Sequence, residues 1–203
     1  MDLGVQFMAS KWLTTTAMAV GLMAIPGVAS AENQWRLFGG ISSAEDLETT
    51  YYGYTAEIST DSGFVVGAGL GVVQGDFVWE GELAYRSSEL DEISFLGYSY
   101  AIDGDLSAVS LMLNGWYNFP TTGNWGGYVG GGLGIAQVEA DVGGGYSYDS
   151  TEFAWQVGAG LNLKTQSGFA YGIGYRYFSV PEIDNSNVDF SSHEILFEIS
   201  SRF

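Results

Sequence analysis

The sequence contains no cysteine. Disulfide bonds, thiolate metal ligands and cysteine nucleophiles are therefore excluded. If the protein is exported, its stability must come from another source. A closed ladder of backbone hydrogen bonds in lipid would supply it.

Basic residues are scarce. The chain has 6 lysines and arginines against 24 aspartates and glutamates, which gives a net charge of −18 at pH 7. Nucleic acid and other anionic surfaces repel such a chain, so no nucleic-acid partner is expected. Strong acidity is typical of disorder where aromatic residues are few, but 15% of this chain is aromatic and it holds 30 glycines. This composition instead predicts a compact all-β protein.

Long apolar runs are absent except near the start of the chain. Lys11 precedes an apolar run over residues 12–25, which Pro26 and the small residues 29–31 follow. This order is typical of a secretory signal peptide. An anchoring helix is the alternative, but the run is shorter than the roughly 20 residues that span a bilayer.

We therefore expect a signal peptide over residues 1–31 and one mature domain over residues 32–203. Met1 and Met8 both remain possible starts, because the signal pattern begins at the second of them. Since the mature part has no run long enough for a membrane helix, any structure that spans a membrane must be built from strands.

Residues 191–203 show a strand with two different faces. One row is apolar (Ile195, Phe197, Ile199 and Phe203), and the alternate row is charged (Glu194, Glu198 and Arg202). This period of two is typical of outer-membrane β-barrels, whose strands alternate lipid-facing and lumen-facing residues.

The same alternation predicts eight strands in the mature domain. They cover residues 33–42, 62–73, 76–88, 104–119, 125–139, 151–164, 168–180 and 191–203. Three connections are short and four, over residues 43–61, 89–103, 140–150 and 181–190, are long.

Short periplasmic turns opposite long extracellular loops are typical of outer-membrane barrels. The predicted fold is thus an all-β, eight-stranded antiparallel up-and-down transmembrane β-barrel, with both termini in the periplasm. Residues 51–60 could form a further membrane strand. We favour their extending the strand over residues 62–73 beyond the membrane, because ten strands would leave some connections too short.

The lumen-facing rows of the predicted strands carry all four arginines of the mature domain, while the lipid-facing rows carry no charge. Buried charges persist only when they are paired, so these rows predict a charge network inside the barrel. Its expected members are Arg36, Glu80, Glu82, Arg86, Arg176, Glu194, Glu198 and Arg202. Since an eight-stranded interior is just wide enough to be filled by side chains, we expect no open pore.

Several segments resemble a family of small outer-membrane β-barrel domains from Gram-negative bacteria, which includes opacity-like proteins and surface antigens. They are residues 77–86 (FVWEGELAYR), 113–119 (LNGWYNF), 128–136 (YVGGGLGIA), 153–161 (FAWQVGAGL), 174–178 (GYRYF) and the final Phe203.

The resemblance implies a location in the outer membrane and contact with its lipid and lipopolysaccharide. It also implies assembly by periplasmic chaperones and the barrel-assembly machinery, with Phe203 as part of the assembly signal. We expect a monomer.

His193 is the one histidine, and it lies among Ser191, Ser192 and Glu194. Some outer-membrane barrels hydrolyse acyl chains of lipid A with a His/Ser/Glu set near their last strands. A nucleophile needs its base within hydrogen-bond reach and a third group to orient that base, and no spacing in the sequence ensures this. A histidine at the barrel rim is the favoured interpretation.

Acidic residues gather in the predicted loops, for example near residues 45–48, 89–92 and 182–189. Oxygen ligands suit Ca²⁺ and Mg²⁺, but the spacing of an EF-hand is missing. We expect no dedicated metal site and no cofactor, and instead a diffuse acidic surface that divalent cations bridge to lipopolysaccharide. Glycine clusters lie inside strands and lack the G-x-G-x-x-G pattern of a nucleotide site.

The sequence thus favours a non-enzymatic barrel that serves envelope integrity, adhesion or surface antigenicity. A lipid A hydrolase that uses His193 and a narrow solute channel are the alternatives.

Overall fold

The computed structural model describes residues 32–45, 47–51, 54–60, 62–95, 98–142, 146–181 and 189–203. The expected signal peptide, residues 1–31, lies outside the described residues. The ten strands are β1 (Glu32–Ala44), β2 (Leu47–Tyr51), β3 (Tyr54–Thr60), β4 (Ser62–Gln74), β5 (Phe77–Phe95), β6 (Tyr98–Pro120), β7 (Trp125–Val142), β8 (Tyr146–Lys164), β9 (Phe169–Val180) and β10 (Phe190–Arg202). Among the described residues, no helix is long and apolar enough to cross a membrane.

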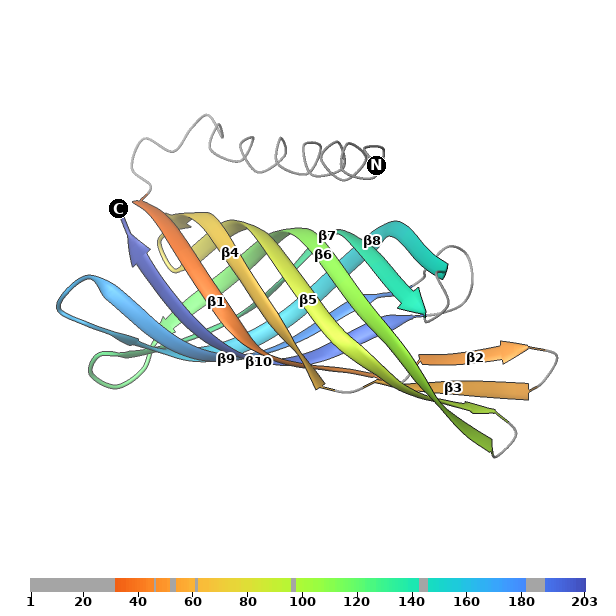
Figure 1. Ribbon diagram of the computed structural model, residues 1–203. Coiled ribbons are helices and arrows are strands. Elements are labelled where there is room, and N and C mark those ends of the chain that lie inside the picture. Colours follow the sequence, from red (N-terminus) through yellow and green to blue (C-terminus); the bar gives the residue numbers. More distant parts are fainter. Residues whose placement is uncertain are drawn as a thin grey trace, which may run out of the picture. The chain divides into compact units, whose positions relative to one another are not determined.

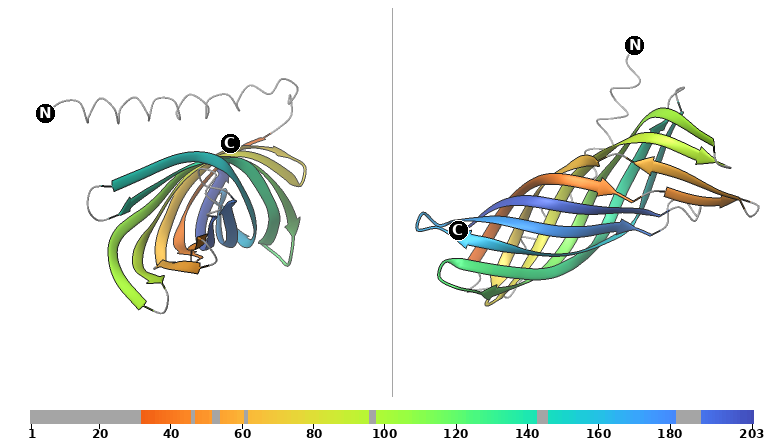
Figure 2. Two further views of the ribbon diagram at one scale, coloured as in Figure 1. Left: turned by 90° about the vertical axis from the view of Figure 1, so that its right-hand side faces the viewer. Right: turned by 90° about the horizontal axis from the view of Figure 1, so that it is seen from below.

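Eight of these strands close into an antiparallel barrel, which Figure 1 shows from the side and Figure 2 from two further directions. The order around the barrel is β5, β4, β1, β10, β9, β8, β7, β6, and a further pairing between β5 and β6 closes the ring. Strand β1 pairs with β10 along its length, for example at Phe38 and Glu198. The predicted fold class is confirmed.

The two ends of the barrel differ. One end, called the turn end, carries Glu32, Phe203 and three short turns, and lies to the left in Figure 1. Each of these turns contains a glycine with φ between 62° and 86°, a conformation that residues with a Cβ rarely adopt. The opposite end is called the loop end.

Strands β2 and β3 form a hairpin at the loop end (Figure 1). Strand β3 pairs with the outer part of β5, where Ile58 faces Ile93, while β4 pairs with the inner part of β5, where Phe64 faces Ser87. The segment over residues 54–60 therefore extends the path of β4 past the barrel, as the favoured interpretation held, and is not an additional strand of the ring.

The strands at the loop end are longer than predicted. Residues 89–103 and 140–150 were expected to be loops, but β5 runs to Phe95, β6 begins at Tyr98, β7 runs to Val142 and β8 begins at Tyr146. The prediction relied on apolar alternation, which ends where the lipid-facing rows end. Backbone pairing between neighbouring strands continues beyond that point because it needs no apolar face.

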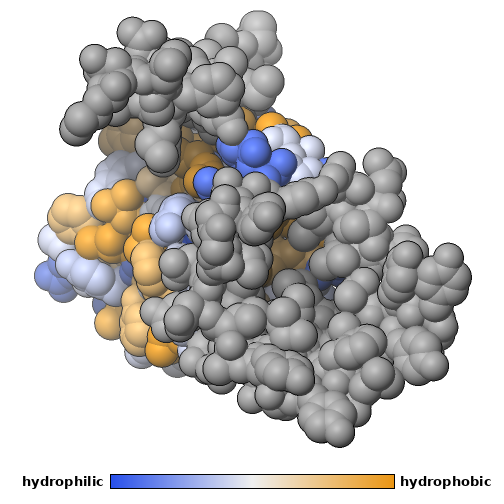
Figure 3. Space-filling view, turned by 45° about the vertical axis from the view of Figure 1, so that its right-hand side comes forward, coloured by the Kyte–Doolittle hydropathy of each residue, from blue (hydrophilic) through white to orange (hydrophobic). Residues whose placement is uncertain are grey.

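The outer wall of the barrel is apolar. Large hydrophobic side chains on alternate residues are about half exposed, including Leu133 at 61% and Phe197 at 64%. Orange side chains of this kind are visible on the wall in Figure 3 where grey atoms do not cover it. The predicted parity between lipid-facing and lumen-facing residues thus agrees with the described strands.

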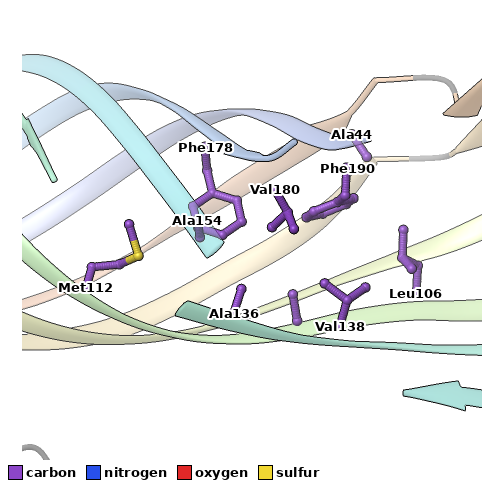
Figure 4. Packing of buried hydrophobic residues seen from close by; sticks show 10 residues of the cluster. Ala44, Leu106, Met112, Ala136, Val138, Ala154, Phe178, Val180 and Phe190 are labelled. Atoms are coloured by element: carbon purple, nitrogen blue, oxygen red, sulfur yellow. The ribbon is translucent and has the colours of Figure 1, made fainter. Parts of the chain in front are cut away.

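The loop-end half of the lumen is mainly apolar, although it also holds buried serines such as Ser42 and Ser192. The sequence interpretation missed this. Figure 4 shows a cluster, here called the apolar plug, in which Phe178, Val180 and Phe190 pack with small and aliphatic side chains of β1, β6, β7 and β8. The remaining members are Ala44, Leu106, Ala108, Met112, Ala136, Val138 and Ala154. The expected polar interior is therefore wrong for this half, because the charged lumen residues lie closer to the turn end.

Candidate functional site in the barrel lumen

The charged side chains of the lumen form one connected network between the apolar plug and the turn end. Seven of the eight predicted members meet in it: Arg36, Glu80, Glu82, Arg86, Arg176, Glu194 and Glu198. They come from β1, β5, β9 and β10, so the network ties opposite walls of the barrel together. This set is called the lumen network below.

Arg36 is the centre of the part of the network nearer the turn end. Its Nη2 donates to Glu80 Oε1 at 2.6 Å and to Glu82 Oε2 at 2.8 Å, and its Nε donates to Glu80 Oε2 at 3.1 Å. Its Nη1 donates to Glu198 Oε1 at 3.0 Å. One guanidinium therefore balances part of the charge of three carboxylates, all shielded from solvent.

Arg86 and Arg176 form the part nearer the apolar plug. Arg86 Nε donates to Glu194 Oε1 at 2.6 Å, and Arg176 Nη1 donates to Glu82 Oε1 at 2.8 Å and lies 3.9 Å from Glu194 Oε2. The Cζ atom of Arg86 lies 3.7 Å from the centroid of the Phe178 ring. This stacking joins the lumen network to the apolar plug.

Neutral side chains complete the network. Trp116 Nε1 donates to Glu80 Oε1 at 3.0 Å, and Tyr128 donates its hydroxyl to Glu198 Oε1 at 2.9 Å. Asn114 and Gln156 donate to Glu82 at 3.1 and 3.2 Å. Ser110, which accepts from Arg86 Nη1 at 2.7 Å, was not foreseen because a serine in a strand carries no pattern of its own.

Arg202 was expected in the network and does not belong to it. Its Nη1 instead pairs with Glu32 Oε2 at 3.1 Å, and the two side chains are 45% and 64% exposed. Arg202 has the predicted parity, but it is the last residue of β10 and lies at the turn end, one step past the enclosed part of the lumen.

The lumen is hollow near the turn end. A cavity of about 540 Å³ lies between the turns and the lumen network. The inner part of the cavity is lined by residues that belong to the lumen network or donate to it. They are Arg36, Glu80, Trp116, Tyr128 and Glu198. The expectation of a filled interior is therefore wrong at this end, while the network and the apolar plug fill the rest of the described lumen.

His193 lies on the outer wall at the loop end. Its Nδ1 is 2.6 Å from the Tyr175 hydroxyl, and its Nε2 is 2.9 Å from Glu45 Oε1. The ring also contacts that of Tyr177, with 5.1 Å between centroids. The sequence did not indicate this set, because Glu45 and His193 lie 148 residues apart and meet only through the pairing of β1 with β10.

The serines next to His193 are engaged elsewhere. Ser191 donates to Ser179 at 3.1 Å, and the buried Ser192 donates to Glu194 at 3.4 Å. A serine nucleophile hydrogen-bonded to His193 is therefore not formed by these two residues. Within the part of the chain that the structure describes, no group of three or more metal-ligating side chains could hold a metal ion.

Comparison with known proteins gives one family and several similar structures. The family profile described as "Outer membrane protein beta-barrel domain" matches residues 14–203. The crystal structure of Neisserial surface protein A (NspA) is 17% identical with a TM-score of 0.58, and the match covers 84% of this chain and 97% of that chain. This likeness supports the closed-barrel fold. No curated protein matches the sequence.

Two other structures have lower TM-scores. The outer membrane protein OprG from Pseudomonas aeruginosa is 15% identical with a TM-score of 0.47, and the match covers 85% of this chain and 97% of that chain. The outer membrane enzyme PagL is 13% identical with a TM-score of 0.43, and the match covers 80% of this chain and 97% of that chain.

Proposed function

Because the chain belongs to the family of outer membrane protein β-barrel domains, we propose that it is a structural barrel whose loop end makes contacts at the cell surface. As a member of this family it is a protein of the Gram-negative outer membrane. The proposal adds that it has no catalytic activity and no open channel, and that it acts as a monomer in envelope integrity, adhesion or surface antigenicity.

This proposal rests on the packing of side chains in the lumen beyond its hollow turn end. Side chains of the lumen network and the apolar plug are nearly inaccessible, with Arg86 at 1% and Phe178 at 0%. A solute that crossed the barrel would have to break buried ion pairs and displace packed rings, and both steps are costly. A closed barrel whose strands project at one end is better suited to making contacts at a surface than to letting a solute pass.

The distribution of charge indicates which end makes the contacts. Three of the five basic residues in 32–203 lie in the lumen network, and the other two, Lys164 and Arg202, end strands at the turn end. The described residues of the loop end therefore include no lysine or arginine, while they carry most of the described acids. We propose that divalent cations bridge this acidic end to the phosphates of lipopolysaccharide.

The orientation is part of the proposal. Short turns on the periplasmic side and longer projections outside are usual for such barrels, so the turn end with Glu32 and Phe203 would face the periplasm. The absence of cysteine makes this testable by labelling. Single replacements Asp189→Cys at the loop end and Ser167→Cys at the turn end both alter exposed residues.

On intact cells, a membrane-impermeant maleimide should label Asp189→Cys and leave Ser167→Cys unlabelled, while both should react after the outer membrane is disrupted. Labelling of only Ser167→Cys on intact cells would reverse the orientation. For the surface role, chelation of divalent cations should increase dye uptake more in cells with the protein than in cells without it. An equal increase would count against bridging to lipopolysaccharide.

A lipid A hydrolase is the second candidate, because His193 has both a carboxylate and a hydroxyl within 2.9 Å. Such a set resembles a base oriented by an acid. The backbone N–H groups of β10 around His193 are used in pairing with β1 and β9, which leaves no adjacent pair to stabilise an oxyanion. His193→Ala should therefore leave the acylation of lipid A unchanged by mass spectrometry, and a loss of deacylation in that variant would establish the enzyme.

A further inference from the structure

The cavity at the turn end combines a confined space with side chains of both charges. Its volume of about 540 Å³ lies within the range of small-molecule sites. Besides the residues of the lumen network, its lining includes Asp76, Lys164 and Arg202, which lie at the mouth because they belong to a turn or end a strand. The rings of Trp116 and Tyr128 form part of the inner wall.

The lumen network contains one carboxylate more than its arginines can balance. Four glutamates face three arginines, and all seven side chains are at most 7% exposed. A buried negative charge without a counter-charge is unfavourable. Two of the four glutamates, Glu80 and Glu198, line the cavity, and Glu198 is the more exposed of them, at 7% against 2%.

One oxygen of Glu198 is available to a ligand. Oε1 accepts from Arg36 at 3.0 Å and from Tyr128 at 2.9 Å. Oε2 has no hydrogen-bond partner among the described residues and lies next to Gly172, where a Cβ would come within 3.3 Å of it. The missing side chain of Gly172 thus leaves room beside a carboxylate oxygen inside the cavity.

The mouth of the cavity holds a cation without a counter-charge. Lys164 lines the cavity but forms no ion pair with any described acid, whereas Arg202 is paired with Glu32 at 3.1 Å. Lys164 faces Ala170 on β9, and Gly172 on the same strand faces Glu198. Neighbouring strands lie about 4.8 Å apart, and the two residues are offset by two positions along β9. The backbones of Lys164 and Glu198 are therefore separated by roughly 12 Å across β9, whose small side chains leave that space open.

We propose that this cavity binds a small zwitterion such as an amino acid or a short peptide, with its ammonium group at Glu198 and its carboxylate at Lys164. The ammonium group supplies the positive charge that the lumen network lacks. The carboxylate meets the ammonium of Lys164. The proposal goes beyond the surface role above and does not depend on it.

Calorimetric titration of the purified, folded barrel in detergent micelles tests the proposal, with glycylglycine as the probe. Saturable one-to-one binding is expected, and methylammonium or acetate alone should bind at least about tenfold more weakly, because each makes only one charged contact. Glu198→Gln and Lys164→Met should each weaken glycylglycine binding by about tenfold or more. Asp189→Asn, which alters an exposed acid at the loop end outside the cavity lining, is the matched control and should leave the affinity unchanged.

Because Glu198→Gln alters the lumen network, Gly172→Ala provides a second variant that narrows the site and keeps every charge. It should also weaken binding, while the heat-modifiable migration on gels shows that each barrel is folded. The proposal is overturned if the wild type shows no saturable binding, if methylammonium or acetate binds as tightly as glycylglycine, or if the cavity variants bind like the control.

Discussion

Arg86 of β5 and Glu194 of β10 meet across the lumen with 2.6 Å between Nε and Oε1. Their side chains are 1% and 0% exposed, so water does not weaken the attraction. The pair lies where the lumen network meets the apolar plug, and it joins two strands that are not neighbours in the barrel.

Removing one partner of this pair should be costly. Glu194→Leu leaves Arg86 buried without its main counter-charge, and we expect the free energy of unfolding to fall by about 3–5 kcal/mol. Urea unfolding in lipid vesicles, followed by tryptophan fluorescence, measures the change. The double variant Arg86→Met with Glu194→Leu should recover most of the loss, because the charge balance of the network is then the same as in the wild type. A double variant as unstable as the single one would contradict this account.

The arginines of the lumen network should contribute unequally to the free energy of unfolding. Arg36 donates four hydrogen bonds to three glutamates, whereas Arg176 has one ion pair below 3 Å and its Nε and Nη2 have no hydrogen-bond partner. Arg36→Met should therefore lower the unfolding free energy by roughly 1–3 kcal/mol more than Arg176→Met in the same urea assay. Equal losses for the two variants would mean that the extra bonds of Arg36 are not stabilising.

The filled lumen should block ions. In planar lipid bilayers the wild type is expected to show no conductance steps, because packed side chains close the path. The double variant Arg86→Ala with Phe178→Ala removes a stacked pair from the lumen and should increase the leak. Phe197→Ala is the control, because Phe197 lies on the outer wall and is 64% exposed. This variant should not increase the leak. Stable conductance steps from the wild type would support the channel alternative instead.

Gly174 makes room for Tyr128. A Cβ on Gly174 would overlap the hydroxyl of Tyr128, which donates to Glu198 at 2.9 Å. Gly174→Ala should cost about 1–3 kcal/mol of unfolding free energy. Adding Tyr128→Phe removes the overlapping oxygen and should restore part of the lost unfolding free energy. As a comparison, a Cβ on Gly39 has its nearest neighbours at 3.6 Å, so Gly39→Ala should change stability little.

Phe203 closes the seam between the first and last strands. Its backbone N donates to Asn33 O at 2.9 Å and its O accepts from Asn33 N at 3.1 Å, while its ring is 68% exposed. If the ring is part of the assembly signal, deletion of Phe203 should reduce the fraction of heat-modifiable, folded protein in outer membranes. Phe203→Tyr keeps an aromatic end and should assemble normally. Equal assembly after deletion would remove Phe203 from the signal.

The sequence predicted the face on which each strand residue lies more reliably than the partner that it meets. Parity follows from an extended backbone, so Arg36, Arg86 and Arg176 could be assigned to the lumen directly. Pairing depends on the closure of the ring and on how far each side chain reaches. For that reason the sequence could not show that Arg36 takes three glutamates while Arg202 takes Glu32 outside the network.

Contacts between distant segments were also invisible in the sequence. Glu45 and Tyr175 meet His193 only because β1 and β9 flank β10, and Lys164 shares a cavity with Glu198 only because β9 between them carries small residues. The apolar plug was missed for a related reason. Its members have lumen parity and occupy the loop-end part of the barrel. The charged rows nearer the turn end had suggested a polar interior throughout.

The amino-acid sequence by itself determined an all-β chain with an apolar outer face and an inward-facing set of arginines and glutamates. It also determined eight strands that are long enough to close into a barrel. These properties follow from local alternation, which the backbone of a strand converts directly into two faces. Only the tertiary structure decided how the lumen divides into an apolar plug, a lumen network with one excess carboxylate and a hollow turn end. That division depends on strand register and ring closure, which bring together residues up to 170 positions apart.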